Sequence, residues 1–340
     1  QDRPSAVDEA KWGFAVIENS LWQALPAFLK EFDIALQEKF GHSMPPDFSP
    51  IKFTSWMGGD RDGNPNVTAS LTQEVLSLSR WMAADLYLRD IRELTNELSM
   101  WDASEELVKA ASIHRDAFKR NRDEPYRLIL ANVRKRLLAT MDWSAKLAKG
   151  ELAEPGDALL TNEELLEPLM MCYRSLMEKG MHSVANGLLL DTIRRASCFG
   201  LPLLKLDIRQ DSERHLNVMS ELTQYLGLGD FATWEEQDKQ TFLIKELQNK
   251  RPLIPQVWPC SDEVREVLAT CSVVAAQPAE ALGSYVISMA SLPSDVLTVI
   301  LLLKESGIEH NMGVVPLFET LDDLSGANDA IDALLSIPWY

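Results

Sequence analysis

Hydrophobic residues recur at helical spacing over most of the chain. The clearest case runs from Leu71 to Met100, where apolar residues three or four positions apart share the segment with arginine and glutamate. This pattern predicts a long amphipathic helix with a charged outer face. Pro26 sits where a second N-terminal helix is expected to begin. The same spacing predicts further helices over 7–24, 26–40, 104–119, 126–147 and 162–179, with a loop at 150–156.

Four short β-rich runs interrupt the helical pattern. The later three are each followed by polar residues and a predicted helix, and such alternation is typical of a parallel sheet. We therefore expect an α/β fold that is predominantly helical. Four strands could form an open sheet or half of a (β/α)8 TIM-type barrel, and a helical insertion over about 71–200 favours an elaborated barrel. The predicted strands lie near 53–57, 203–208, 284–289 and 313–318.

Charge and cysteine content restrict the partners and the compartment. The chain has 51 acidic and 33 basic residues, and a net charge of -18 argues against a broad surface for nucleic acid or anionic membranes. Its four cysteines show no CxxC spacing, so we expect buried thiols in a reducing cytoplasm. We find no apolar run of membrane-spanning length and no secretory core in the first ten residues, which also favours a cytoplasmic protein.

One turn combines two glycines with three charged residues and is the most informative segment of the chain. Gly58 and Gly59 follow the first predicted strand and permit backbone angles that other residues disfavour. The acidic and basic residues Asp60, Arg61 and Asp62 come directly after them. In parallel α/β folds the carboxyl ends of strands carry the active site, so this turn is expected to meet a ligand.

Other strands also end in polar residues. Glu319 follows the last strand and could supply an oxygen ligand to Mg²⁺, which needs only one or two carboxylates. Arg209 follows the second strand, and its planar fork suits phosphate or carboxylate. Together these residues predict a site for a phosphorylated acid. Two further polar residues, Asp211 and Ser288, lie at strand ends as well.

Structural roles remain open for the same residues. Glu319 could cap the helix that follows it, and Arg209 could form a structural ion pair with its acidic neighbours. The three charged residues of the turn could pair with one another and brace it. Asp60 and Asp62 also resemble, weakly, the metal-nucleotide carboxylate pair of some sugar transferases. The five histidines are scattered, and we expect packing or surface roles for them.

Several segments taken together resemble the phosphoenolpyruvate carboxylase family of the bacterial type. The resemblance extends over essentially the whole chain, which is similar to a central portion of that enzyme. It implies a (β/α)8 barrel domain wrapped in many extra helices. The segments are FTSWMGGDRDGNPNVT, LLKLDIRQDSERH, YVISMA, PLFETLDDL, DEAKWGFAVIENSLW, ANGLLLDTIRRASCFG and KRPLIP.

The resemblance implies an anaplerotic, carbon-fixing reaction. Bicarbonate attacks the phosphoryl group of phosphoenolpyruvate, which gives carboxyphosphate and the enolate of pyruvate. Carbon dioxide is then released and captured by the enolate, so the products are oxaloacetate and phosphate. The family also implies Mg²⁺, for which Mn²⁺ can substitute, and a cytoplasmic, allosteric homotetramer.

The resemblance also implies roles for individual residues. Glu319 is similar to a family metal ligand, and Arg209 to an arginine that contacts phosphate. Trp56 and Leu317 resemble the apolar pocket for carbon dioxide, although both would fill the core by default. Arg61 is a further candidate for substrate binding at the mouth of the site.

Three family segments do not occur in this sequence. They are a histidine segment similar to TAHPT, an acidic strand similar to GYSDSAKD and a loop reading GRGGS. We therefore expect a fragment that is inactive alone, because half a metal site cannot stabilise the transition state. Its open sheet edges could drive self-association. The alternative is a non-catalytic helical module for folding or assembly.

Overall fold

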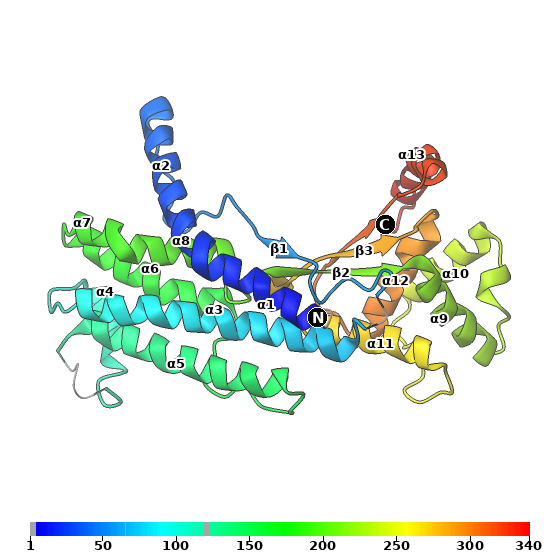
Figure 1. The fold of residues 1–340 in the computed structure, drawn as a ribbon, viewed down its shortest axis with the longest axis horizontal. Coiled ribbons are helices and arrows are strands. Elements are labelled where there is room, and N and C mark those ends of the chain that lie inside the picture. The colour runs from blue at the N-terminus through cyan, green and yellow to red at the C-terminus, as the bar shows by residue number, and fades with distance from the viewer. Residues whose placement is uncertain (1–4, 65, 119–122) are drawn as a thin grey trace. The chain divides into compact units, whose positions relative to one another are not determined.

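The structure is a computed structural model that describes residues 5–64, 66–118 and 123–340 (Figure 1). The chain divides into two compact units. A helical unit comprises Gln1–Phe53 and Glu74–Leu204, and a sheet unit comprises Thr54–Gln73 and Lys205–Tyr340. Among the described residues, no helix is both long enough and apolar enough to cross a membrane.

The helical unit contains most of the predicted amphipathic helices. Its longest element, α3, begins in the sheet unit and continues into the helical one. The elements are α1 (Ala6–Val16), the π-helical turn η1 (Ile17–Leu21), α2 (Trp22–Phe40), α3 (Ala69–Glu97), α4 (Glu105–Ser112), α5 (Pro125–Ala148), α6 (Asn162–Glu178), α7 (His182–Val184), the π-helical turn η3 (Ala185–Leu189) and α8 (Leu190–Phe199).

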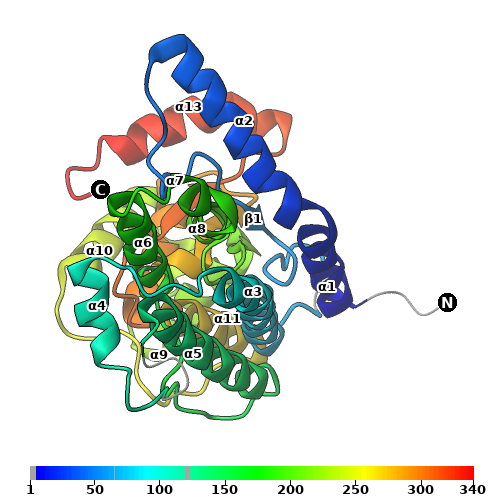
Figure 2. The same ribbon diagram turned by 90° about the vertical axis from the view of Figure 1, so that its left-hand side faces the viewer.

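Aromatic side chains join the helices of this unit. Trp22 of α2 stacks on Phe199 of α8 with ring centroids 5.3 Å apart, and it meets Tyr87 of α3 edge-on at 5.1 Å. The guanidinium of Arg80 lies 4.9 Å from the ring centroid of Trp143, which connects α3 to α5. Helices α3, α5 and α6 accordingly run alongside one another in two perpendicular views (Figures 1 and 2).

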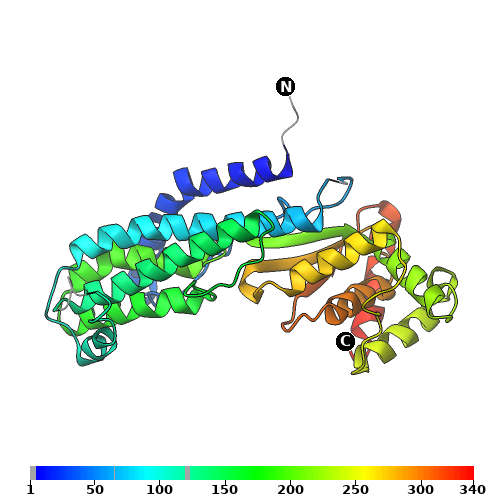
Figure 3. The ribbon, with the colours of Figure 1, turned by 90° about the horizontal axis from the view of Figure 1, so that it is seen from below.

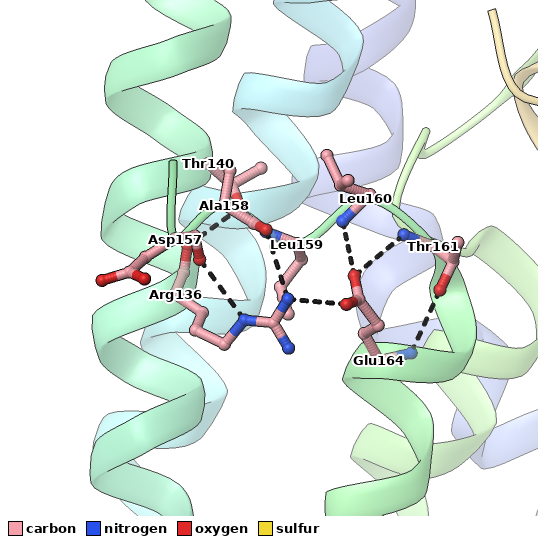
Figure 4. Close-up of polar contacts among 8 residues, drawn as sticks. All are labelled: Arg136, Thr140, Asp157, Ala158, Leu159, Leu160, Thr161 and Glu164. Carbon is pink, nitrogen blue, oxygen red and sulfur yellow. Dashed lines mark hydrogen bonds and ion pairs between the residues drawn. The ribbon is translucent and has the colours of Figure 1, made fainter. Parts of the chain in front are cut away.

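Helix α6 starts at a capping box that also ties down the preceding loop (Figure 4). The side chain of Thr161 accepts from the backbone N–H of Glu164, and the Glu164 carboxylate accepts from the N–H groups of Thr161 and Leu160 at 3.3 and 2.7 Å. Arg136 of α5 donates to Glu164 at 2.8 Å and to the Ala158 carbonyl at 3.2 Å. The loop that precedes α6 is therefore fixed to α5 by hydrogen bonds.

Two helix boundaries differ from the expected ones. Pro26 was expected to start a helix, but it lies inside α2, which begins at Trp22. The π-helical turn η1 joins α1 to α2, so the chain stays helical where the sequence indicated a break. The helix predicted over 104–119 ends at Ser112, and its predicted last residue, Lys119, lies outside the described residues.

The sheet unit contains four parallel strands in the order β1-β2-β3-β4. This confirms the prediction of a predominantly helical α/β chain with four parallel strands. The strands are β1 (Thr54–Ser55), β2 (Lys205–Asp211), β3 (Leu282–Ser288) and β4 (Gly313–Pro316). The helical elements are α9 (Ser212–Tyr225), η4 (Phe231–Thr233), α10 (Glu236–Gln248), α11 (Asp262–Ala275), η5 (Ala279–Ala281), α12 (Pro293–Glu305) and α13 (Leu321–Leu335).

The two faces of the sheet differ in character. Successive side chains of a strand point to opposite faces, and in β2 buried residues such as Ile208 alternate with partly exposed ones such as Asp207 and Arg209. On the buried face Tyr285 hydrogen-bonds to His215 of α9 at 2.9 Å. Helix α11 lies in front of the strands when the unit is seen from below (Figure 3). The charged residues therefore project from the face opposite to this covered side.

Candidate active site

Arg209 lies at the centre of a cluster of charged side chains on the partly exposed face of the sheet. Its Nη2 donates to Glu319 Oε1 at 3.2 Å and to Asp62 Oδ2, and its Nε lies 3.7 Å from Asp60 Oδ1. We call these four residues the Arg209 cluster. Each side chain is about one-third exposed, with values of 30–34%. The cluster is therefore open to a ligand while its members restrain one another.

The glycine turn fixes the acidic residues beside Arg209 through backbone hydrogen bonds. The Arg209 N–H donates to the Gly59 carbonyl at 2.9 Å, and the Arg61 N–H donates to the Arg209 carbonyl at 2.9 Å. Asp60 is thereby the parallel bridge partner of Arg209. The Asp62 N–H donates to Asp60 Oδ1 at 3.0 Å, so the second carboxylate is positioned by the first.

The electrostatics of the cluster favour a charged guanidinium. Partial burial lowers the pKa of Arg209, but the hydrogen bond that Arg209 donates to Asp62 and the negative charges of Asp60, Asp62 and Glu319 outweigh this effect, so the net pKa is raised. One cation faces three carboxylates, which leaves the cluster with excess negative charge. Such an arrangement favours a further cation, and a divalent metal ion would make the four groups neutral overall.

Glu319 does not act as the side-chain cap of the helix that follows it. Helix α13 begins at a capping box in which Thr320 accepts from the Asp323 N–H at 3.1 Å and Asp323 accepts from the Thr320 N–H at 3.1 Å. The segment before Glu319 stays beside β3, because the Leu317 N–H donates to the Ile287 carbonyl at 2.9 Å. Glu319 is therefore delivered to the cluster by the continuation of β4.

The carboxylates of the cluster could supply only part of the ligands of a hard divalent cation. Among the described residues, no group of three or more His, Cys, Asp or Glu side chains has the geometry to hold a metal ion. Mg²⁺ needs only one or two carboxylates and fills its other positions with water and substrate oxygen. A partly exposed carboxylate such as Glu319 fits one such position, and the remaining ligands would come from elsewhere.

Arg61, Trp56 and Leu317 lie apart from the side chains of the cluster. Arg61 is only 7% exposed, and its guanidinium donates to the Gly59 carbonyl at 3.0 Å and to Thr72 Oγ1 at 2.6 Å, which braces the turn. Trp56 is 67% exposed and so does not fill the core, while Leu317 is half-buried. Within the described part of the chain, no hydrogen bond or ion pair joins the side chains of these three residues to the cluster.

Asp60 and Asp62 are weaker site candidates in the sequence than Arg209 and Glu319, but the structure places both beside Arg209. The signal was present, since two aspartates flank an arginine directly after a glycine pair. Their contacts with Arg209 join distant parts of the sequence, 147 residues apart for Asp62, and could not be predicted from spacing. His215 offers no alternative base, because full burial lowers its pKa to about 3 and it packs against Tyr285.

A parallel sheet with charged side chains near its carboxyl edge is the arrangement of an α/β enzyme. Comparison with known families gives the particular class. The family described as phosphoenolpyruvate carboxylase matches residues 1–340. The chain belongs to the phosphoenolpyruvate carboxylase family.

Individual relatives agree with this assignment. The chain is 60% identical over 339 residues to phosphoenolpyruvate carboxylase of Hahella chejuensis and 60% identical to that of Marinobacter nauticus, in each case over 100% of the chain. It is 56% identical to that of Escherichia coli O81 over 99% of the chain. In all three comparisons the chain spans 38% of the length of the relative.

Proposed function

We propose that this chain is part of a phosphoenolpyruvate carboxylase and supplies one portion of its active site. The complete enzyme would convert phosphoenolpyruvate and bicarbonate into oxaloacetate and phosphate. The observation that carries the proposal is the convergence of Arg209 and Glu319, 3.2 Å apart, in a chain whose whole length matches the family. Two neighbouring side chains of opposite charge suit a substrate that carries a phosphoryl group and needs a metal ion.

Each residue has a distinct task in this proposal. Arg209 holds the phosphoryl group of phosphoenolpyruvate while bicarbonate oxygen forms its bond to phosphorus and the enolate oxygen leaves. Trp56 and Leu317 offer apolar surface to carbon dioxide after it separates from phosphate. Arg61 acts indirectly, because its guanidinium is engaged in holding the turn.

The proposed enzyme has a (β/α)8 barrel of which this chain contributes four strands. Purely parallel sheets are normally covered on both faces, and here one face is packed against helices while the other carries partly exposed charged residues. The two outer strands, β1 and β4, each pair on one side only in the described residues. Further strands of the complete protein would continue the sheet at both edges and enclose the Arg209 cluster.

We further propose that Glu319 is a ligand of Mg²⁺ or Mn²⁺. When bound, the ion would supply charge stabilisation to the enolate oxygen. Replacement of Glu319 by alanine in the complete protein is expected to raise the dissociation constant for Mn²⁺ by at least about tenfold, which is about 1.4 kcal/mol. Electron paramagnetic resonance of free Mn²⁺ measures this without any turnover. Glu309→Ala, an exposed acidic position outside the cluster, is the matched control, and equal affinities of the two variants would refute the ligand role.

Replacement of Arg209 by glutamine tests the central assignment. In the complete protein, kcat/KM for phosphoenolpyruvate is expected to fall by at least about tenfold because the cation that holds the phosphoryl group is lost. Oxaloacetate is measured by coupled reduction with malate dehydrogenase. The control is Arg265→Gln in the same unit, which breaks an exposed ion pair with Asp262. If Arg209→Gln lowers the melting temperature but keeps kcat/KM, the cluster is a structural ion-pair network.

Compartment and assembly complete the proposal. All four cysteines are free, and Cys172, Cys198 and Cys271 are buried, which supports a reducing compartment such as the cytoplasm. We also propose that the complete protein is a homotetramer, as the family resemblance implies.

A further inference from the structure

Asp62 contacts Arg209 more closely than any other side chain of the glycine turn. Its Oδ2 accepts from Arg209 Nη2, and its own N–H is fixed by Asp60 Oδ1 at 3.0 Å. Asp60 is fixed as well, because the backbone on either side of it hydrogen-bonds to the backbone of Arg209. The carboxylate that supports the guanidinium is therefore fixed to the strand that carries Arg209 by a closed chain of hydrogen bonds.

The contacts of Arg209 are concentrated on one part of its guanidinium. Nη2 faces Asp62 and Glu319, and Nε faces Asp60. Within the described part of the chain, Nη1 has no hydrogen-bond or ion-pair partner. An arginine side chain has several rotatable bonds, and a carboxylate on one nitrogen fixes the plane in which the others lie. The free nitrogen can then meet an oxygen anion without reorganisation.

The two directly bonded carboxylates are held by different segments of the chain. Glu319 lies after the end of β4 and is the group that would turn toward a divalent cation. Asp62 is held by the turn, whose Gly59 approaches the Asp207 backbone so closely that an added Cβ would lie 2.0 Å from its carbonyl oxygen. Asp62 is thus the partner that would stay with Arg209 if Glu319 turned to a cation.

We propose that Asp62 is a positioning residue for the carboxylation reaction. Its carboxylate holds the guanidinium of Arg209 with Nη1 directed at the phosphoryl group of phosphoenolpyruvate. Asp60 fixes Asp62 by accepting a hydrogen bond from its N–H. The proposal rests on the proposed function, because it deepens the role of the same arginine.

The test uses Asp62→Ala and Asp62→Asn in the complete protein, with Asp262→Asn as an exposed control in the same unit. If Asp62 positions Arg209, Asp62→Ala raises the KM for phosphoenolpyruvate by about tenfold and leaves the KM for bicarbonate within about twofold. Asp62→Asn recovers part of the loss, because the amide oxygen still accepts a hydrogen bond from Nη2. A merely structural role would not separate the two substrates in this way.

Three outcomes overturn the proposal. The KM for phosphoenolpyruvate could stay unchanged in Asp62→Ala, both KM values could rise together, or both Asp62 variants could fail to fold while Asp262→Asn folds. The Arg209→Gln variant distinguishes failure of the positioning role from failure of the proposed function. If Arg209→Gln loses activity and Asp62→Ala does not, only the positioning role is wrong. If Arg209→Gln is fully active, the proposed function itself fails.

Discussion

Replacement of Arg195 by methionine is expected to lower the free energy of unfolding by about 3–5 kcal/mol at neutral pH. Arg195 is 4% exposed and lies on α8. Its Nη1 donates to Asp90 Oδ2 of α3 at 2.8 Å. Removal of one partner from a buried ion pair leaves the other charge without compensation, so the loss is far larger than for a surface pair.

A second contact adds to the expected loss. Pro26 lies inside α2 and has no N–H, so the carbonyl four residues earlier, that of Trp22, lacks its helical partner. Arg195 Nε donates to this carbonyl at 2.7 Å. The same arginine therefore satisfies a backbone acceptor that proline leaves open, and methionine cannot replace that bond. This contact also explains why Pro26 is tolerated within the helix.

The expected loss depends on pH through Asp90. Burial raises the pKa of Asp90, and Arg195 opposes that shift by stabilising the carboxylate. A raised pKa means that the native state binds a proton more tightly than the unfolded state, so stability falls as pH rises above the ordinary aspartate range. Without Arg195 this pKa rises further. The deficit of Arg195→Met is thus largest near pH 7 and shrinks as the pH falls toward the ordinary aspartate range, where Asp90 takes up a proton.

Urea unfolding followed by circular dichroism at pH 7 and at pH 4.5 measures both effects. Arg89→Met is the matched control, because Arg89 is a helical arginine that pairs with Glu18 and Asp85, but its side chain is 49% exposed. Its cost should stay below about 1 kcal/mol. Equal losses in the two variants, or an Arg195→Met deficit that grows toward acid pH, would contradict the assignment.

Local periodicity predicted the helices well because each depends on nearby residues. The long helix expected from Leu71 to Met100 is α3, Ala69–Glu97. Strand ends were harder to predict. The second strand was expected to end at Ile208, yet β2 continues to Asp211, since one face of the sheet is polar and charged residues can extend the strand there. Arg209 accordingly lies within the strand and not after it.

The site could be predicted only in part, for a physical reason. Residue type and position at strand ends indicated Arg209 and Glu319, and the structure brings these two together. The partners of each charge depend on register between strands, which the sequence does not display. Asp60 and Asp62 could therefore be assigned to the site only once the bridge between Asp60 and Arg209 was seen. Arg61, equally charged and next to both, points instead to the carbonyl of Gly59 and to Thr72.

Replacement of Gly59 by alanine is expected to reduce both stability and activity of the complete protein. The added Cβ would lie 2.0 Å from the Asp207 carbonyl oxygen and 3.1 Å from its carbon, and neither backbone atom can move aside as a flexible side chain would. The turn must shift away from β2, at a cost of about 1–3 kcal/mol or more. The same shift breaks the bridge that places Asp60 and Asp62 at Arg209. A displacement of about 1 Å at a catalytic group can lower the rate about 100-fold, so kcat/KM for phosphoenolpyruvate should fall to that extent.

Gly326→Ala is the matched control for this variant, because it adds the same methyl group to exposed helix α13 with no atom within 4 Å. Alanine favours a helix over glycine by up to about 1 kcal/mol, so this control should be neutral or slightly stabilised and fully active. Thermal unfolding and steady-state kinetics, run well below the melting temperature of the weaker variant, separate loss of fold from loss of geometry. If Gly59→Ala matches Gly326→Ala in both measurements, the turn does not depend on close approach to β2. The rigid support that we infer for Arg209 would then have no structural basis.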